Sequence, residues 1–137
     1  MRSANQVTLD CRRLRAVLDN DADALREVLL AFVAIQPPRM AALQCALQSS
    51  DLNEASRLVH LLVGSFQSTE MPRLGWLAQR VELAVGRADL DACRKAYGDL
   101  SVQFRMRMSA LGRLLDMPSA LASEMPSKSC PPQRSQS

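Results

Sequence analysis

The sequence has few aromatic residues and few glycines, and this limits the folds it can form. Only 4% of its 137 residues are Phe, Trp or Tyr, and five are glycine. A core with so few rings must consist mainly of Leu, Val, Ala and Met, of which Leu, Ala and Met favour helices. An all-β fold would need more turn-forming residues than five glycines supply. The composition therefore predicts an all-α protein, and the length suits one domain with a single core.

Signals for a metal site, a membrane span or secretion are also absent. The four cysteines, Cys11, Cys45, Cys93 and Cys130, include no CxxC pair and no neighbouring histidine, which argues against zinc and against a secreted disulfide framework. Cys11, Cys45 and Cys93 lie among helical apolar positions, where we expect free thiols to pack as small hydrophobes. No uninterrupted apolar run approaches the ~18 residues of a membrane span, and the start MRSANQVT lacks the apolar region of a secretory signal. We expect a cytoplasmic protein with no metal of its own and no membrane partner.

The charge is mild and mixed. The net charge is +3, and no run of Lys or Arg reaches five residues. Basic and acidic residues alternate along the helical segments, which is typical of a solvated helix surface. The hypothesis that the protein is a helical nucleic-acid adaptor is supported only by the net charge. We therefore expect no nucleic acid as a partner.

The N-terminal half divides into several expected helices. Thr8 or Asp10 can begin a short one, and the acidic turn at 19–23 can cap a second, in which Leu25, Leu29 and Phe32 share one face. Pro37 and Pro38 are expected to end this helix. They suit the first turn of another helix that runs to about residue 47.

Three longer elements follow. Asp51 and Glu54 fit a capping box, in which each side chain reaches the other's exposed amide, and this helix should run to about residue 66 or 67. Pro72 begins the next helix, and Asp89 caps the last one. Apolar positions in that helix repeat at three- and four-residue steps, as in a bundle seam: 90, 93, 97, 100, 104, 108 and 111. From Met117 the chain is rich in Pro and Ser, so we predict a helical bundle over 1–116 and a disordered tail over 117–137.

His60 is the single histidine of the chain, and helical phase predicts that it is exposed. The core face of its helix comprises Leu58, Val59, Leu62 and Phe66, together with position 55. His60 lies about 140° from the centre of this face. It is therefore either a surface residue without a role in function or an exposed functional residue.

Gly64 favours the functional alternative. It lies one turn after His60 on the outer face, where a mid-helix glycine costs about 1 kcal/mol relative to alanine. One reason for it is the close approach of another molecule, and the other is close contact with a neighbouring helix. Leu61 and Val63 also fall outside the core face, so we expect exposed apolar surface beside His60, which suggests docking.

These residues resemble a histidine-containing phosphotransfer (HPt) domain. The family pattern is roughly H-x-L-K-G-S, a short linker, and then L-x-x-L-x-x-x-L-E on the facing helix. Here residues 60–65 read HLLVGS and residues 74–82 read LGWLAQRVE, with no gap between the two halves. The resemblance covers about residues 8–115.

The resemblance implies an antiparallel four-helix up-and-down bundle with a short additional N-terminal helix. It also implies that His60 accepts a phosphoryl group from an aspartyl phosphate on a response-regulator receiver domain and passes it to another receiver. The partners would be receiver domains and a hybrid sensor kinase, and the receiver would supply Mg²⁺. Since such a transfer depends mainly on positioning and charge, one exposed imidazole suffices on this chain. The protein would be a phosphocarrier with no independent turnover of a small substrate.

The resemblance assigns further residues around His60. Glu82 would accept a hydrogen bond from His60 Nδ1 and present Nε2 outward, or it is an ordinary exposed helix acid. Val63 replaces the family's usual lysine, and Arg57 would substitute for that charge or is a common surface residue. An acid, Glu70, replaces the glycine usual in the following turn. The expected receiver-docking residues are Leu61, Val63, Gly64 and Gln67.

Two functions agree with these residues. The first is phosphoryl transfer through His60. The second is a non-catalytic HPt-like module that binds and sequesters a receiver, for which the loss of the lysine at Val63 is the argument. The intact pair of His60 and Gly64 favours the first, because a module that only docks has no chemical need for the histidine.

Overall fold

The computed structural model describes residues 21–115, which form four α-helices and no strand. They are α2 (Ala22–Gln48), α3 (Leu52–Ser68), α4 (Pro72–Gly86) and α5 (Leu90–Leu114). The all-α prediction is confirmed for this part of the chain. The short N-terminal helix, the domain boundary at 116 and the tail over 117–137 lie outside the described residues.

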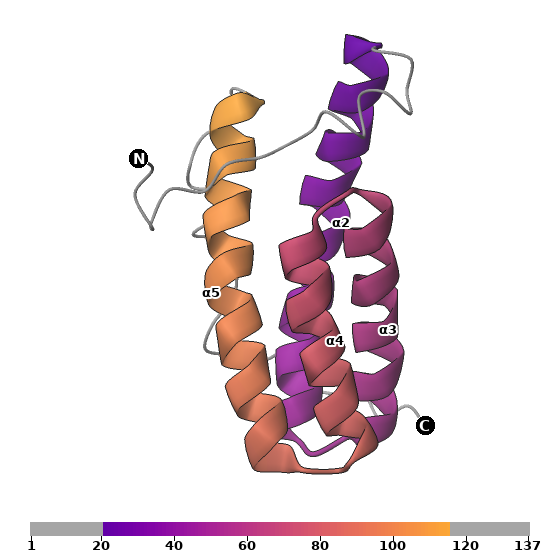
Figure 1. The fold of residues 1–137 in the computed structure, drawn as a ribbon, viewed down its shortest axis with the longest axis vertical. Coiled ribbons are helices and arrows are strands. Elements are labelled where there is room, and N and C mark those ends of the chain that lie inside the picture. Colours follow the sequence, from indigo (N-terminus) through magenta and orange to yellow (C-terminus); the bar gives the residue numbers. More distant parts are fainter. Residues whose placement is uncertain (1–20, 116–137) are drawn as a thin grey trace.

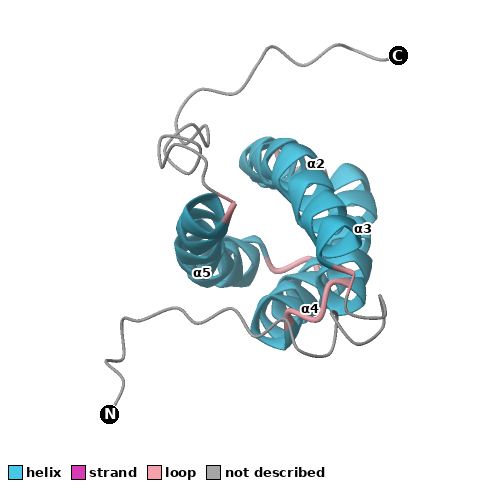
Figure 2. Cartoon of the chain, turned by 90° about the horizontal axis from the view of Figure 1, so that it is seen from above, coloured by secondary structure: helices cyan, strands magenta, loops and turns pink. Residues whose placement is uncertain are grey.

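The four helices surround a common centre. Seen from above, they follow one another in chain order, and each contacts two neighbours, since α5 also packs against α2 (Figure 2). Short turns join α3 to α4 at one end of the bundle and α4 to α5 at the other (Figure 1). This arrangement places α3 and α4 side by side along their whole length.

α2 is one continuous helix, and this corrects a prediction. Pro37 and Pro38 lie inside it, although the sequence analysis ended one helix and began another there. A proline inside a helix removes a hydrogen bond and typically costs about 3 kcal/mol. Here the residues around the prolines are well packed: Gln36 is 4% exposed and Met40 is fully buried. Burial of this segment therefore outweighs the local cost, and α2 continues through it to Gln48.

Aspartates begin three of the four helices. The Oδ1 atom of Asp21 accepts hydrogen bonds from the amides of residues 23 and 24, that of Asp51 from residue 54, and that of Asp89 from residue 92. Each carboxylate satisfies amides that lack a partner in the first turn and lies at the positive end of the helix dipole. α4 begins instead with Pro72, which needs no such partner. These starts are the predicted ones.

The turns between the helices share one backbone conformation. Ser50, Glu70 and Ala88 have φ of 60°, 57° and 57°. In each case the next amide donates back into the preceding helix, as from Asp51 to the carbonyl of residue 46 and from Met71 to that of residue 66. Glycine adopts this conformation without strain, which accounts for the glycine that the family usually has at the position of Glu70.

The three phenylalanines of the chain meet in the centre. Phe32 of α2, Phe66 of α3 and Phe104 of α5 have ring centroids 5.9 to 6.3 Å apart. The Tyr97 hydroxyl of α5 donates to the carbonyl of Met40 on α2 at 2.9 Å. The predicted seam of α5 is buried from position 93 to position 111, and position 90 is half-buried.

One expectation about the cysteines needs revision. Cys93 is a buried free thiol, as expected, and burial raises its pKa. Cys45 is disulfide-bonded, so it is not the free thiol we expected. The cytoplasmic location rested in part on free thiols and stays a prediction. α2 is long and apolar enough to cross a membrane by length and composition, a test that core helices of soluble proteins also pass.

Candidate functional site

His60 lies on the solvent side of α3. Its side chain is 79% exposed, whereas Leu58, Val59 and Leu62 on the other side of the helix are at most 3% exposed. The predicted phase of this helix is therefore confirmed, and a packed histidine is excluded.

Glu82 of α4 orients the imidazole. Its Oε2 atom lies 3.2 Å from His60 Nδ1, across the α3–α4 interface. In the neutral ring, an Nδ1–H that donates to this carboxylate leaves the lone pair on Nε2, at the other side of the ring. The expected contact of Glu82 is present, so it is not simply an exposed helix acid. In this tautomer Nε2 has a free lone pair and can act as a nucleophile.

Gly64 leaves open space beside the imidazole. A Cβ atom built at this position would meet no other group within 4 Å. Close contact with a neighbouring helix, the alternative considered from the sequence, does not occur there. Because the glycine has no side chain, nothing protrudes from the surface one turn after His60. A second molecule can therefore approach closely there.

Val63 is buried, which corrects the expectation that it adds exposed apolar surface. It is 8% exposed and belongs to the hydrophobic core, whereas Leu61 is 36% exposed. The phase of an isolated helix placed Val63 outside the core face. However, α3 packs against both α2 and α4, so its buried arc is wider than one stripe. Of the two apolar neighbours of His60, Leu61 alone stays available for docking.

Gln67, the fourth expected docking residue, is exposed at the end of α3 near α4. Its Cγ would lie 3.5 Å from a Cβ atom on Gly75. The glycine therefore leaves room for the stem of Gln67 against α4. Gln67 lies two turns after His60 on the same side of the bundle, which keeps it in the candidate docking surface.

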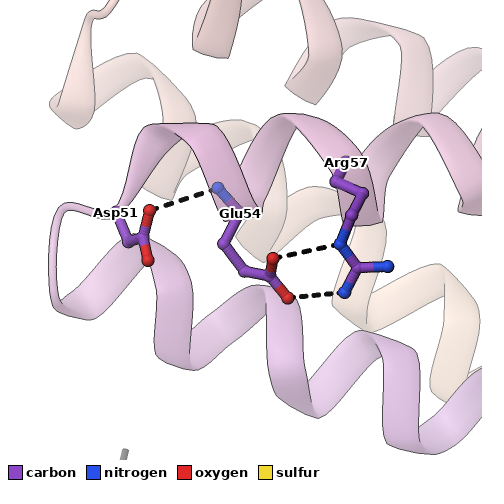
Figure 3. A network of polar contacts seen from close by, with 3 residues as sticks. All are labelled: Asp51, Glu54 and Arg57. Atoms are coloured by element: carbon purple, nitrogen blue, oxygen red, sulfur yellow. Dashed lines mark hydrogen bonds and ion pairs between the residues drawn. The ribbon is translucent and has the colours of Figure 1, made fainter. Parts of the chain in front are cut away.

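Arg57 is paired with Glu54 instead of reaching toward His60. Its Nε and Nη2 atoms donate to the two carboxylate oxygens of Glu54 at 3.0 and 2.6 Å (Figure 3). Hydrogen bonding by Arg57 lowers the pKa of Glu54, and the same contact raises the pKa of Arg57. Both side chains are well exposed, so the pair is open to solvent and to competing anions.

The same contact revises the predicted capping box. Asp51 accepts from the amide of Glu54 at 3.2 Å, as expected, but the Glu54 carboxylate turns to Arg57 (Figure 3). The sequence analysis thus missed Glu54 as the partner of Arg57. The three-residue spacing of acid and arginine on one helix was the signal for it.

Ser65, the last residue of the HLLVGS motif, connects α3 to α2. Its hydroxyl accepts a hydrogen bond from Nη1 of Arg39 at 3.0 Å, and the same nitrogen lies 3.5 Å from Oε1 of the buried Gln36. The serine therefore lies on a different side of α3 from His60. It fixes the helix that carries the histidine.

The structure thus joins His60 and Glu82 directly, with Gly64 and Leu61 beside them, and holds Arg57 one turn away on Glu54. Among residues 21–115, no group of three or more His, Cys, Asp or Glu side chains is placed to hold a metal ion. The arrangement offers one oriented nucleophilic nitrogen on an open surface.

Comparison with known proteins agrees with this geometry. The family model described as the Hpt domain matches residues 27–121, which include both helices of the candidate site. No curated protein and no solved structure matches the chain.

Proposed function

Because the chain belongs to the Hpt domain family, which serves histidine phosphotransfer in two-component phosphorelays, we propose that His60 is its phosphoacceptor. His60 would receive the phosphoryl group from an aspartyl phosphate of one receiver domain and pass it to another. The observation that supports this most directly is the contact between His60 Nδ1 and Glu82 Oε2 at 3.2 Å.

The chemistry follows from that contact. Nε2 attacks the phosphorus, the bond from phosphorus to the aspartyl oxygen breaks, and the carboxylate leaves. The product is an Nε2-phosphorylated ring that still carries the Nδ1 proton and therefore a positive charge. Glu82 is placed to offset that charge. The reverse sequence, with the aspartate of the next receiver as nucleophile, returns His60 to its starting state.

The receiver supplies the remaining groups in this proposal. Its aspartate, with the Mg²⁺ that the receiver would hold, would approach over Gly64, beside Leu61 and Gln67, where the surface is open. Arg57 is the basic residue of α3 one turn before His60. The incoming phosphoryl oxygens can compete with Glu54 for its guanidinium. The four helices would form an antiparallel up-and-down bundle, which agrees with turns at alternate ends (Figure 1). The protein would be cytoplasmic.

A second function remains open because of Val63. Its buried side chain leaves no cation at the position of the usual lysine. A module that docks on a receiver and sequesters it, without accepting phosphate, would tolerate this loss. It would not need the oriented Nε2 of His60.

Transfer of labelled phosphate separates the two functions. The protein is incubated with receiver domains that carry labelled aspartyl phosphate, and acid-labile label on the chain is measured. Since His60 is the only histidine, the control His60→Gln removes every histidine from the sequence. Label on the wild type and none on the variant supports transfer. A receiver that binds both proteins equally and labels neither contradicts it and supports sequestration.

A further inference from the structure

The outer face of α4 carries a second regular pattern, which the function of His60 does not use. It consists of Arg73, Trp76, Arg80 and Leu83 of α4 and of Arg87, which follows the last residue of that helix, at steps of three, four, three and four residues. This spacing gathers them in one stripe, about 21 Å long, along the helix. All five are exposed, and Trp76 and Leu83 keep 50% and 57% of their surface in solvent. We call this stripe the Arg–Trp seam.

The seam is separate from the candidate phosphotransfer site. Glu82 points toward His60 on α3, whereas Trp76 and Leu83 lie about 100–120° around α4 from it. On its other side the seam borders α5, where Arg107 lies near Arg73. A molecule bound along the seam would therefore contact α4 and α5, and leave α3 free.

The arginines of the seam gather positive charge on one face of the molecule. The guanidinium carbons of Arg73 and Arg80 lie 5.9 and 5.2 Å from the centre of the Trp76 ring. Within residues 21–115, no salt bridge joins the seam arginines or Arg107 to an acid. Burial and the nearby charge of Arg73 both lower the pKa of Arg107. The guanidiniums of the seam and of Arg107 therefore repel one another. An acidic partner would reduce this repulsion.

A shallow pocket lies at one end of the seam. It has a volume of about 160 Å³. It is lined by Arg80, Leu83 and Arg87 of the seam, by Ala84 of α4, by Asp89 in the turn before α5, and by Ala92 and Ala96 of α5. Small side chains on α5 and a leucine on α4 leave room there for one apolar side chain of a partner. Two arginines line this pocket and Trp76 lies further along the seam, and both residue types contribute strongly to protein interfaces.

The ends of the chain outside the described residues do not match this surface in charge. Residues 1–20 contain four arginines and two aspartates, and residues 116–137 contain two acids and two basic residues. Neither offers an acidic helix to four arginines. A nucleic acid fits less well than a protein, since Leu83 gives phosphate nothing to bind and the guanidiniums of Arg73 and Arg80 already lie against the Trp76 ring.

We propose that the Arg–Trp seam docks an acidic amphipathic helix of a partner protein. The partner places apolar side chains on Trp76, on Leu83 and in the pocket, and its carboxylates face Arg73, Arg80 and Arg87. The two-heptad length of the seam makes this a transient contact, weakened by salt. The site is independent of the phosphotransfer proposed for His60.

The only tryptophan of the chain lies in the seam, so its fluorescence reports binding directly. The probe is a synthetic helical peptide with Leu and Glu at alternating three- and four-residue steps, and the control peptide has Lys in place of Glu. We expect the acidic peptide to change the Trp76 fluorescence of the full-length chain and the basic peptide to leave it unchanged. Arg80→Glu should weaken binding by about tenfold or more.

Two variants serve as matched controls. Lys95→Glu makes the same charge change at an exposed position of α5 outside the seam and should alter the affinity by less than about twofold. His60→Gln should bind the peptide like the wild type, because His60 lies outside the seam. Peptide binding and phosphotransfer are therefore tested independently, and the failure of one proposal would not contradict the other.

Several results would overturn the proposal. They are no binding of the acidic peptide, an equal loss in Arg80→Glu and Lys95→Glu, or a stronger fluorescence response to a single-stranded oligonucleotide or to anionic vesicles. A concentration-dependent dimer that Arg80→Glu abolishes would assign the seam to a second copy of this chain instead.

Discussion

The face around His60 and the Arg–Trp seam lie on neighbouring surfaces of one bundle, but their charges are arranged in opposite ways. Around His60 each charged group has a partner, since Glu82 contacts the imidazole and Glu54 holds Arg57. Along the seam the arginines lie against the Trp76 ring and near one another. Paired charges fix the orientation of one reactive atom, whereas positive charges gathered on one face attract a partner over a larger area. The two faces should therefore respond to different substitutions.

The largest expected effect separates the two faces completely. His60→Gln should abolish acid-labile labelling and leave the affinity for the acidic peptide unchanged, because the histidine lies outside the seam. Arg80→Glu should do the opposite, and keep the rate of labelling within about twofold of the wild type. Labelling and Trp76 fluorescence are measured on the same preparations. A loss of both activities in either variant would show that the faces are coupled.

The next effect concerns access to His60. Gly64→Arg should weaken receiver docking by about a hundredfold, because a long side chain would occupy the open space over which the receiver approaches. Gly98→Arg is the matched control, since a Cβ atom on Gly98 of α5 also meets nothing within 4 Å. Docking is measured by calorimetry, and circular dichroism checks the helices. Equal docking by both variants would contradict the orientation of the His60 face.

A smaller effect is expected at Glu82. Glu82→Gln should slow phosphoryl transfer by about tenfold and leave docking unchanged, because the amide neither fixes the imidazole tautomer nor offsets the charge of the phosphorylated ring. Rapid-quench kinetics with a labelled receiver measures the rate. Asp91→Asn, which neutralises an exposed acid at the start of α5, should transfer at the wild-type rate. If both variants transfer equally fast, Glu82 is not a positioning residue.

The smallest effect concerns the core that carries both faces. Burial raises the pKa of Tyr97, the only tyrosine, to about 12, whereas an exposed tyrosine titrates near 10. Between these values the unfolded chain has lost a proton that the folded chain keeps, so the stability falls as the pH rises through this window. At neutral pH, Tyr97→Phe should cost about 1 kcal/mol through the lost hydrogen bond to Met40. Neither labelling nor peptide binding should change at that pH.

Urea unfolding at neutral pH and near pH 12 tests the titration. The wild type should lose about 1 to 3 kcal/mol more stability over this interval than Tyr97→Phe. The difference between the two proteins removes the contribution of other groups, such as Cys93, that titrate in the same range. An equal loss would mean that the Tyr97 hydroxyl titrates as it does in the unfolded chain.

Local rules in the sequence predicted most of the helix starts and the orientation of the site. Asp21, Asp51 and Asp89 act within one turn of the chain, so their capping role is visible without tertiary information. The outward phase of His60 follows from the periodicity of α3. The contact with Glu82 could not be derived from periodicity, and it came from the resemblance to the family, which fixes the register of two helices.

The errors occur where tertiary packing overrides a local rule. Pro37 and Pro38 predict a helix end, but burial of the neighbouring Gln36 and Met40 keeps α2 continuous. Val63 falls outside the core face of a single helix, but two neighbouring helices bury it. The Arg–Trp seam does not show in the apolar periodicity of the sequence, because Arg73, Arg80 and Arg87 hold three of its five positions.

The ring cluster of Phe32, Phe66 and Phe104 has a consequence for the speed of signalling. Since three helices each contribute one ring to the same centre, none of the three can shift without opening the core. The His60 face is then a preformed platform that a receiver meets as a rigid body. Association with such a surface needs no slow rearrangement, so diffusion and orientation should set the rate at which receivers bind.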